Sequence, residues 1–590
     1  MLRRIPLAAL AALAAATALS AQGTVPIGAS VDATFRDRRW QVRRLSEFGD
    51  VPATVLFFAT VECPLVQRYL PRIGEFAAAW QRHGVRTVVV YEGAGDDLVD
   101  AAGQCVLAAP AAEFGQDFDG SLAEACGVDR TAAAVVLDRG GRIAYRGRVD
   151  DQYGYGGARE TPSRRDLAAA VEDLLAERPV AVATTEISGC KLTPAAAPVA
   201  TRTPTWARDV APILQRHCQE CHRPDGQAPF SLLEPNQAQK RAAMIAEVVT
   251  EGRMPLWYGS TRHGEFANVR RVPHADRETI AAWADAGAPV GELAERPAPR
   301  QWPEAKWRIG EPDLEIRVLS AIRLPADGVV PYKYFLLPYR FEADTWVEAF
   351  EIRPENKRVL HHCNLVRVRV DERFSQDGFI TGYVPGGDPM VLDPGTAVRI
   401  PKGSALVLQA HYVTTGTPEV DHLGVGLRFP RVAVQKELKV TIVSDRRFEI
   451  PPGAPAHPVR AARTLKHDVD AIGLFVHMHL RGRDITVAAT APDSKEETLL
   501  VVPNYNFDWQ QSYRWDVSGR PFAAGTRIRA LAHYDNSAWN PFNPDPTAPV
   551  RFGEETTDEM MYAFLFWTRR GEALGLVIDP ANGHAVAAGR

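Results

Sequence analysis

Hydrophobic residues in the first third of the chain fall into short runs that alternate between strand-like and helix-like patterns. Strands are predicted from Thr54 to Phe58, Val85 to Tyr91 and Ala133 to Leu137, and helices from Tyr69 to His83 and from Arg165 to Leu175. This alternation is typical of a sheet covered by helices. We therefore expect an α/β domain over residues 24–190.

The pattern changes twice further along the chain. Helical periodicity dominates residues 205–290, whereas short strand-like runs between turns follow Asp313. Proline- and alanine-rich stretches at 191–204 and 291–304 read as linkers. The last region is too long for one β-sandwich of about 100 residues. The predicted fold is thus multidomain: the α/β domain, a small all-α domain over 205–290, and two all-β sandwiches over 305–435 and 436–590.

The N-terminus has the pattern of a secretory signal peptide over residues 1–21. Arg3 and Arg4 precede an apolar run that ends at Leu19, and small residues follow. No later run is apolar and long enough to span a bilayer, so we expect no stable membrane insertion. The net charge of −4 without a basic run disfavours nucleic acid as a partner. The predicted location is the periplasm or the exterior, where one or two disulfides of unspecified connectivity are expected among the five cysteines other than Cys218 and Cys221.

The helical region contains the sequence Cys218-Gln219-Glu220-Cys221-His222. Two thiols at this spacing add to the vinyl groups of a haem, and the adjacent histidine then binds iron. Met254 follows at a distance typical of an axial methionine, which raises the reduction potential of a haem. We therefore predict a covalently bound haem c, and the segment resembles the cytochrome c fold.

The strand-rich region contains a series of metal-binding side chains. They are His361, His362, His411, His477, His479 and Met560. In a strand, His477 and His479 would point to the same face, whereas the adjacent His361 and His362 need a bulge to do so. Imidazoles with one thioether suit copper that cycles between two oxidation states, whereas zinc rarely binds methionine.

This ordered series resembles the copper type II, ascorbate-dependent monooxygenases, the family of peptidylglycine α-hydroxylating and dopamine β-monooxygenases. The resemblance covers residues 305–590 and implies two jelly-roll-like sandwiches whose two copper ions face each other across a solvent-filled cleft. It implies that His361, His362 and His411 bind an electron-transfer copper. It also implies that His477, His479 and Met560 bind the copper at which O2 is activated and a substrate C–H bond is hydroxylated.

The chain departs from this family where the peptide substrate is held. Phe475 stands two residues before the His-x-His pair, where the peptidylglycine enzymes have an arginine for the substrate carboxylate. Tyr562 and Phe564 replace two further polar contacts. These changes disfavour glycine-extended peptides and leave a small organic substrate of unknown identity.

The N-terminal region resembles thioredoxin-like and peroxiredoxin-like proteins. Cys63 lies after a buried strand and before a helix, where those proteins keep a reactive thiol, and Thr60 precedes it as in peroxiredoxins. However, Val66 removes the Cys-x-x-Cys dithiol, and Thr131-Ala132 stands where the fold usually has a cis-proline. Cys63 is a peroxidatic thiol, a disulfide partner of Cys190, or a relic.

Together these features predict a copper monooxygenase that uses O2 and an external electron donor. Electrons would pass through the haem at Cys218, Cys221 and His222 to the first of two copper ions, replacing or supplementing ascorbate. The alternative is a periplasmic copper-binding electron-transfer protein without hydroxylase turnover. The two differ in whether the protein holds two copper ions and consumes O2 with a reductant.

Overall fold

The computed structural model describes residues 25–92, 97–154, 157–192, 202–224, 226–302, 306–369, 378–516 and 518–586. The predicted signal peptide and most of the first predicted linker lie outside these residues. The chain forms two compact units. The first comprises Met1–Asp37, Gln41–Ala94 and Ala111–Pro194, and the second comprises Arg38–Trp40, Gly95–Pro110 and Ala195–Arg590.

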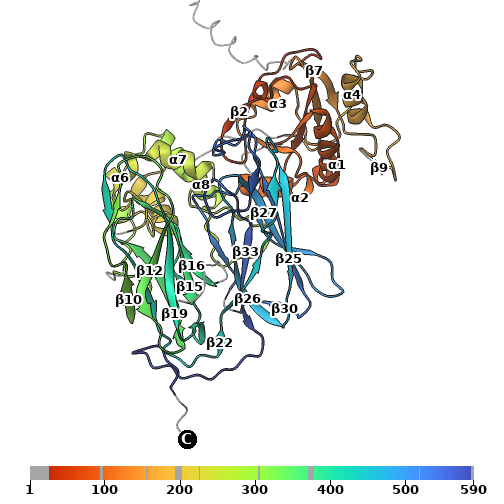
Figure 1. Cartoon of the computed structure of the whole chain (residues 1–590). Helices are drawn as coiled ribbons and strands as arrows, with labels where there is room; N and C mark the ends of the chain where they lie inside the picture. The colour runs from red at the N-terminus through yellow and green to blue at the C-terminus, as the bar shows by residue number, and fades with distance from the viewer. Residues whose placement is uncertain are drawn as a thin grey trace, which may run out of the picture. The chain divides into compact units, whose positions relative to one another are not determined.

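The first unit is built on a seven-stranded sheet in the order β2-β1-β5-β4-β3-β6-β7 (Figure 1). The strands are β1 (Thr34–Arg36), β2 (Val42–Arg44), β3 (Ala53–Ala59), β4 (Arg86–Glu92), β5 (Glu113–Asp117), β6 (Ala134–Asp138) and β7 (Ile143–Gly147). The helices are α1 (Pro64–Trp80), α3 (Ser121–Cys126) and α4 (Asp166–Leu175), with short turns η1 (Leu45–Phe48) and η2 (Gln81–His83) and a small hairpin of β8 (Tyr153–Gly154) and β9 (Gly157–Ala158).

The centre of this sheet has the arrangement of a thioredoxin-like α/β fold. β3, β4 and β5 are parallel, β6 and β7 are antiparallel to them, and α1 follows β3 directly. All seven residues of β3 are buried, as expected for a strand covered on both faces. The predicted α/β domain is therefore confirmed.

Helices in the second unit gather between residues 206 and 295. They are η3 (Trp206–Val210), α5 (Ala211–His217), α6 (Pro235–Gln239), α7 (Ala242–Thr250), α8 (His274–Asp285) and η4 (Leu293–Glu295), and α2 (Leu98–Ala108) belongs to the same unit. Trp206 of η3 and Trp283 of α8 are buried in an apolar core to which α5, α6 and α7 also contribute. Helical periodicity in the sequence predicts one continuous helix from Gln237 to Glu251, which is wrong. It is divided into α6 and α7, because Arg241 takes φ −125° and ψ 11°, outside the helical region.

Residues 314–437 form a first β-sheet domain. Its strands are β10 (Leu314–Arg317), β11 (Ile322–Leu324), β12 (Lys333–Arg340), β13 (Thr345–Val347), β14 (Ala349–Pro354), β15 (Leu360–Arg369), β16 (Phe379–Tyr383), β17 (Met390–Val391), β18 (Thr396–Ile400), β19 (Ser404–Tyr412), β20 (Glu419–Asp421), β21 (Leu423–Arg428) and β22 (Lys436–Glu437). The antiparallel sheets β10-β21-β14-β17 and β12-β19-β15-β16 share one apolar core. Smaller pairings join β11 to β20 and β13-β18-β22.

Residues 439–569 form a second β-sheet domain. Its strands are β23 (Lys439–Val443), β24 (Glu449–Ile450), β25 (His457–Thr464), β26 (Val469–His477), β27 (Gly482–Thr490), β28 (Glu497–Val502), β29 (Ser512–Arg514), β30 (Arg520–Phe522), β31 (Arg527–Tyr534), β32 (Val550–Arg551) and β33 (Tyr562–Arg569). The antiparallel sheets β23-β33-β26-β29 and β25-β31-β27-β28 again share a core, β30 extends β26, and β24 pairs with β32. Among the described residues of both units, no helix has the length and apolarity needed to cross a membrane.

A buried carboxyl pair lies at the ends of two strands in the first unit. Glu92 ends β4, Asp117 ends β5, and their side chains are hydrogen-bonded. Burial, reinforced by Asp117, raises the pKa of Glu92 to about 9. Glu92 is therefore protonated in the folded domain at neutral pH, whereas it is ionised in the unfolded chain.

This difference predicts a pH-dependent stability. Between the ordinary pKa of a glutamate and about 9, the folded domain holds a proton that the unfolded chain has released, so stability falls as the pH rises. Glu92→Gln should remove this fall and raise the melting temperature of the domain more at pH 8 than at pH 5. Scanning calorimetry at both pH values measures this, with the exposed Glu124→Gln as control. An equal shift at both pH values would mean that Glu92 is ionised when folded.

Candidate functional site

Three of the predicted ligands lie together on two neighbouring strands of the first β-sheet domain. His361 and His362 are on β15, and His411 is on β19. Each offers a ring nitrogen, and these nitrogens all lie within 4.8 Å of one another. Leu360 pairs with Tyr412 and His362 with His411, so His361 is an extra residue in the ladder. This irregularity is the predicted bulge, and it brings both histidines to the same site.

Hydrogen bonds determine which nitrogen of each ring faces its neighbours. His361 Nε2 lies 3.0 Å from Asp508 Oδ1, and His362 Nε2 lies 2.9 Å from the Tyr332 hydroxyl. The Nδ1 atoms of His361 and His362 are consequently left 3.2 Å apart. His411 Nδ1 is buried and has no hydrogen-bond partner among the described residues. A buried nitrogen without a partner is costly, and a metal ion would satisfy it.

Two of these imidazoles, His362 and His411, are neutral at physiological pH. Burial, followed by the neighbouring His411 and His361, holds the pKa of His362 well below its ordinary value. Burial, followed by His361, lowers the pKa of His411 to about 4. Neutral imidazole is the form that binds metal ions, so His362 and His411 need no deprotonation to bind one. The described residues thus contain a possible three-histidine metal site in a β-sheet domain.

The second predicted group lies in the other β-sheet domain. The rings of His477 and His479 are 5.1 Å apart between centres. Both were expected on one strand, but β26 ends at His477 and His479 follows it. His477 Nδ1 lies 2.7 Å from Gln510 Oε1, and His479 Nδ1 lies 3.1 Å from the carbonyl oxygen of Asp558. Burial lowers the pKa of His477 to about 4. Burial, followed by a smaller effect of the neighbouring His477, lowers the pKa of His479 to about 3.

Glu559 holds the segment before Met560 against the two histidines. Its buried carboxyl group accepts hydrogen bonds from the backbone N–H groups of His479, at 2.9 Å, and Arg481, at 2.6 Å. Tyr562 then starts β33 opposite His477. Met560 is buried in the apolar cluster that also contains Tyr562. The methionine is therefore carried on a segment that is tied to the His-x-His pair.

Phe507 contacts both histidine groups. It lies between β28 and β29, and its ring centre is 5.1 Å from that of His362 and 5.8 Å from that of His479. The rings of His361 and His411 lie at 5.9 and 6.1 Å from it. The two groups thus face each other across a single phenylalanine ring.

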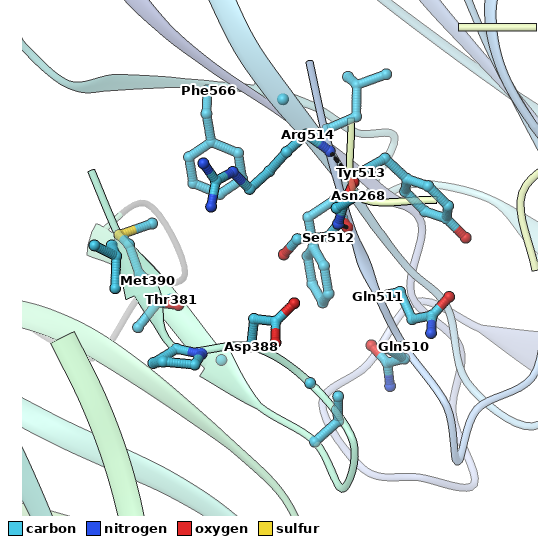
Figure 2. A pocket seen from close by; sticks show the side chains of 18 of the residues that line it. Asn268, Thr381, Asp388, Met390, Gln510, Gln511, Ser512, Tyr513, Arg514 and Phe566 are labelled. Carbon is cyan, nitrogen blue, oxygen red and sulfur yellow. Dashed lines mark hydrogen bonds between the residues drawn. The ribbon is translucent and has the colours of Figure 1, made fainter. Parts of the chain in front are cut away.

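A pocket opens beside these groups (Figure 2). His362 and Gln510 both line it, so it reaches the first group directly and the second through the hydrogen-bond partner of His477. Thr381, Asp388 and Met390 come from one β-sheet domain, and the chain from 510 to 514 comes from the other (Figure 2). Apolar side chains contribute much of the lining, among them Phe379, Leu438, Phe475 and Phe566.

The predicted haem-binding residues lie at the end of α5 and in the turn after it. The thiols of Cys218 and Cys221 are free, and His222 Nδ1 lies 3.2 Å from the Phe230 carbonyl oxygen. Cys221 lines a cavity that shares the segment 381–390 with the pocket of Figure 2. Met254 lines a different, smaller cavity, so its pairing with His222 stays a prediction.

Cys63 lies where the sequence predicted it, at the start of α1 in the first unit, and Thr131 faces it. Sequence reasoning missed five residues around the histidines, which are Tyr332, Phe507, Asp508, Gln510 and Glu559. Glu559 directly precedes the predicted ligand Met560 in the sequence, and this neighbourhood was a usable signal. The other four lie in segments without metal-binding residue patterns.

No family model and no curated protein matches this chain. Parts of it are similar to solved structures. A hypothetical protein from Sinorhizobium meliloti is 24% identical, with a TM-score of 0.27, over 29% of this chain and 95% of that protein. A putative thiol:disulfide interchange protein DsbE from Chlorobium tepidum is 19% identical, with a TM-score of 0.19, over 21% of this chain and 84% of that protein. A peroxiredoxin-like protein from Aquifex aeolicus is 17% identical, with a TM-score of 0.21, over 26% of this chain and 89% of that protein.

The role of Glu559 predicts a stability effect. Glu559→Ala leaves two buried backbone N–H groups without an acceptor and should lower the free energy of unfolding by about 2–3 kcal/mol. Glu559→Gln retains one acceptor oxygen and should lose less. Denaturant unfolding followed by tryptophan fluorescence measures both. The exposed Glu554→Ala serves as control, and an equal loss in Glu554→Ala and Glu559→Ala would contradict this role.

Proposed function

We propose that this protein is an exported copper-dependent monooxygenase that hydroxylates a small organic substrate with O2. The observation that carries the proposal is the convergence of His361, His362 and His411 on one point, opposite His477 and His479. In this proposal each β-sheet domain is a jelly-roll-like sandwich that binds one copper ion.

The first group fits a copper ion through its Nδ1 atoms. Asp508 and Tyr332 occupy the Nε2 atoms of His361 and His362, while the unpartnered Nδ1 of His411 is buried beside them. Partners on the far nitrogen fix the tautomer and orientation of a metal-binding imidazole. Three imidazoles are a ligand set that suits copper.

The second group fits a copper ion through its Nε2 atoms, because Gln510 and the Asp558 carbonyl occupy the Nδ1 atoms of His477 and His479. Met560 would supply the thioether. Copper held by these residues supplies reversible one-electron chemistry toward O2. The residues themselves orient the imidazoles, and the ring of Phe507 packs against both groups.

The pocket of Figure 2 is the proposed substrate site. Phe475 lies in it where an arginine would bind a carboxylate in the peptidylglycine enzymes. Phe379 stacks on Phe475 at 5.8 Å, and Phe566 lines the same pocket. Apolar walls bind apolar groups by excluding water, so the reacting part of the substrate should be apolar.

The segment around Cys218, Cys221 and His222 is the proposed attachment site of a haem c in a small cytochrome-like domain. The Phe230 carbonyl accepts a hydrogen bond from His222 Nδ1–H, which leaves Nε2 for iron. The thiols of Cys218 and Cys221 would hold the haem covalently. A bound haem supplies one-electron transfer from an external donor.

The first experiment is a metal analysis of protein matured in a periplasm, loaded with copper and dialysed. We expect two copper ions per chain, and about one in His411→Ala, in which only the first group is impaired, or in Met560→Ala, in which only the second is. The exposed His467→Ala is the matched control and should retain two. No retained copper in the parent protein would overturn the proposal.

Oxygen uptake then separates an oxygenase from an electron carrier. With ascorbate and a panel of apolar substrates, the two-copper protein should consume O2 and form a hydroxylated product, whereas Met560→Ala should form at least tenfold less. Two bound copper ions without product from any substrate would favour the copper-binding electron-transfer protein instead.

The haem assignment predicts one haem per chain that stays attached after denaturation. Cys218→Ala with Cys221→Ala should release it, whereas Cys126→Ala should not. A haem stain of denaturing gels and a pyridine haemochrome spectrum measure this. Met254→Gln should lower the reduction potential because it removes a thioether, and the exposed Met244→Gln should leave it unchanged. An unchanged potential in Met254→Gln would exclude Met254 as the axial ligand.

A further inference from the structure

The end of the first unit brings a second cysteine back to Cys63. After α4 the chain runs along the sheet edge, where Arg146 N–H donates to the Ala183 carbonyl at 2.9 Å. It then reaches Thr131, whose N–H donates to the Cys190 carbonyl at 2.8 Å, and Leu192 N–H donates to the Asp129 carbonyl at 2.8 Å. Backbone hydrogen bonds on both sides thus fix the position of Cys190.

Thr131 connects the two cysteines. Its hydroxyl lies 3.1 Å from Cys63 Sγ, to which it donates, and accepts from the Cys190 N–H at 3.0 Å. The thiols of Cys63 and Cys190 are themselves hydrogen-bonded to each other. Gly189 has no side chain, and an added Cβ there would overlap the Thr131 carbonyl. The close approach of this segment therefore depends on glycine at position 189.

The two thiols differ in exposure and acidity. Cys63 is 2% exposed at the N-terminal end of α1, whereas Cys190 is exposed to solvent. Burial raises the pKa of Cys63, but hydrogen bonds from Thr131, the Val66 backbone and Cys190 more than offset this and hold the pKa below its usual value. The hydrogen bond to Cys63, followed by burial, raises the pKa of Cys190.

We propose that Cys63 and Cys190 form a reversible disulfide that accepts two electrons from a dithiol partner through the exposed sulfur of Cys190. The spacing differs from that of a Cys-x-x-Cys dithiol, because Cys190 comes from the far end of the domain. The proposal concerns the first unit alone and is independent of copper.

The two electrons are transferred by two successive thiol–disulfide exchanges. A thiolate of the partner attacks the Cys190 sulfur, the bond between the two cysteines breaks, and Cys63 leaves as a thiolate that Thr131 stabilises. The second thiol of the partner then attacks the mixed disulfide and releases Cys190. The partner becomes a disulfide, and its two protons end on Cys63 and Cys190. A thiol of lower pKa is the better leaving group. Cys63 is therefore the sulfur that leaves, and Cys190 is the sulfur that the partner attacks. An external disulfide oxidant reverses the reaction.

Peptide mapping of the full-length protein tests the pairing. After oxidation with oxidised glutathione and blocking of remaining thiols, we expect a peptide that links Cys63 to Cys190. Cys190→Ser should lack it, and the buried Cys126→Ser should keep it. Gly189→Ala retains both thiols but should reduce the yield of the link at least fivefold. No link, or a link of either cysteine to another, would overturn the proposal.

A trapping experiment tests the direction of exchange. Oxidised protein is mixed with one equivalent of reduced glutathione and quenched with excess N-ethylmaleimide. We expect glutathione on Cys190 and maleimide on Cys63. The opposite labelling, or equal labelling of the two sites, would overturn the assigned direction.

Thr131 provides a test that a merely structural role would not pass. In the Cys190→Ser background, Thr131→Val should slow maleimide labelling of Cys63 at pH 7 by about tenfold and move its pH profile up by roughly one unit. Thr131→Ser keeps the hydroxyl and should restore both. Equal profiles in the two Thr131 variants would contradict stabilisation of the departing thiolate by this hydroxyl.

Discussion

Adjacent residues of a regular strand point to opposite faces of a sheet, and the three-histidine cluster depends on β15 breaking this rule at His361. The extra residue in the ladder brings His361 to the side of His362 and opposite His411. In a regular ladder one of the two side chains would point away from the others. The close Nδ1 atoms of His361 and His362, and the contact of His361 with Phe507, depend on this irregularity.

Burial is the second condition of the site, and the two β-sheet domains provide it together. Asp508 and Phe507 come from the second domain but contact histidines of the first. Removing imidazoles from water disfavours their charged forms, so the pKa values of His362 and His411 fall. The contact between the two β-sheet domains thereby favours the neutral form of these two rings, which is the form that binds a metal ion.

The sequence predicted the parts that repeat a local pattern. The buried run at β3 predicted the centre of the first unit, and the ordered histidine series predicted the first cluster, including the need for a bulge. It did not predict that His479 lies beyond β26 or that a helix breaks at Arg241, because no glycine or proline marks either place. The roles of Tyr332 and Asp508 could not be predicted from the sequence, since they come from tertiary contacts with residues distant in the chain.

Because of Phe507, the loop between β28 and β29 is constrained in length and sequence as residues of a protein interior are. Loops between strands usually tolerate insertions and exchanges, because they lie on the surface and touch little. Here one ring packs against four imidazoles from two domains. A single added residue between β28 and β29 would displace that ring from both groups at once. The length of this loop is therefore as restricted as the identity of the histidines, and the two groups cannot diverge independently of each other.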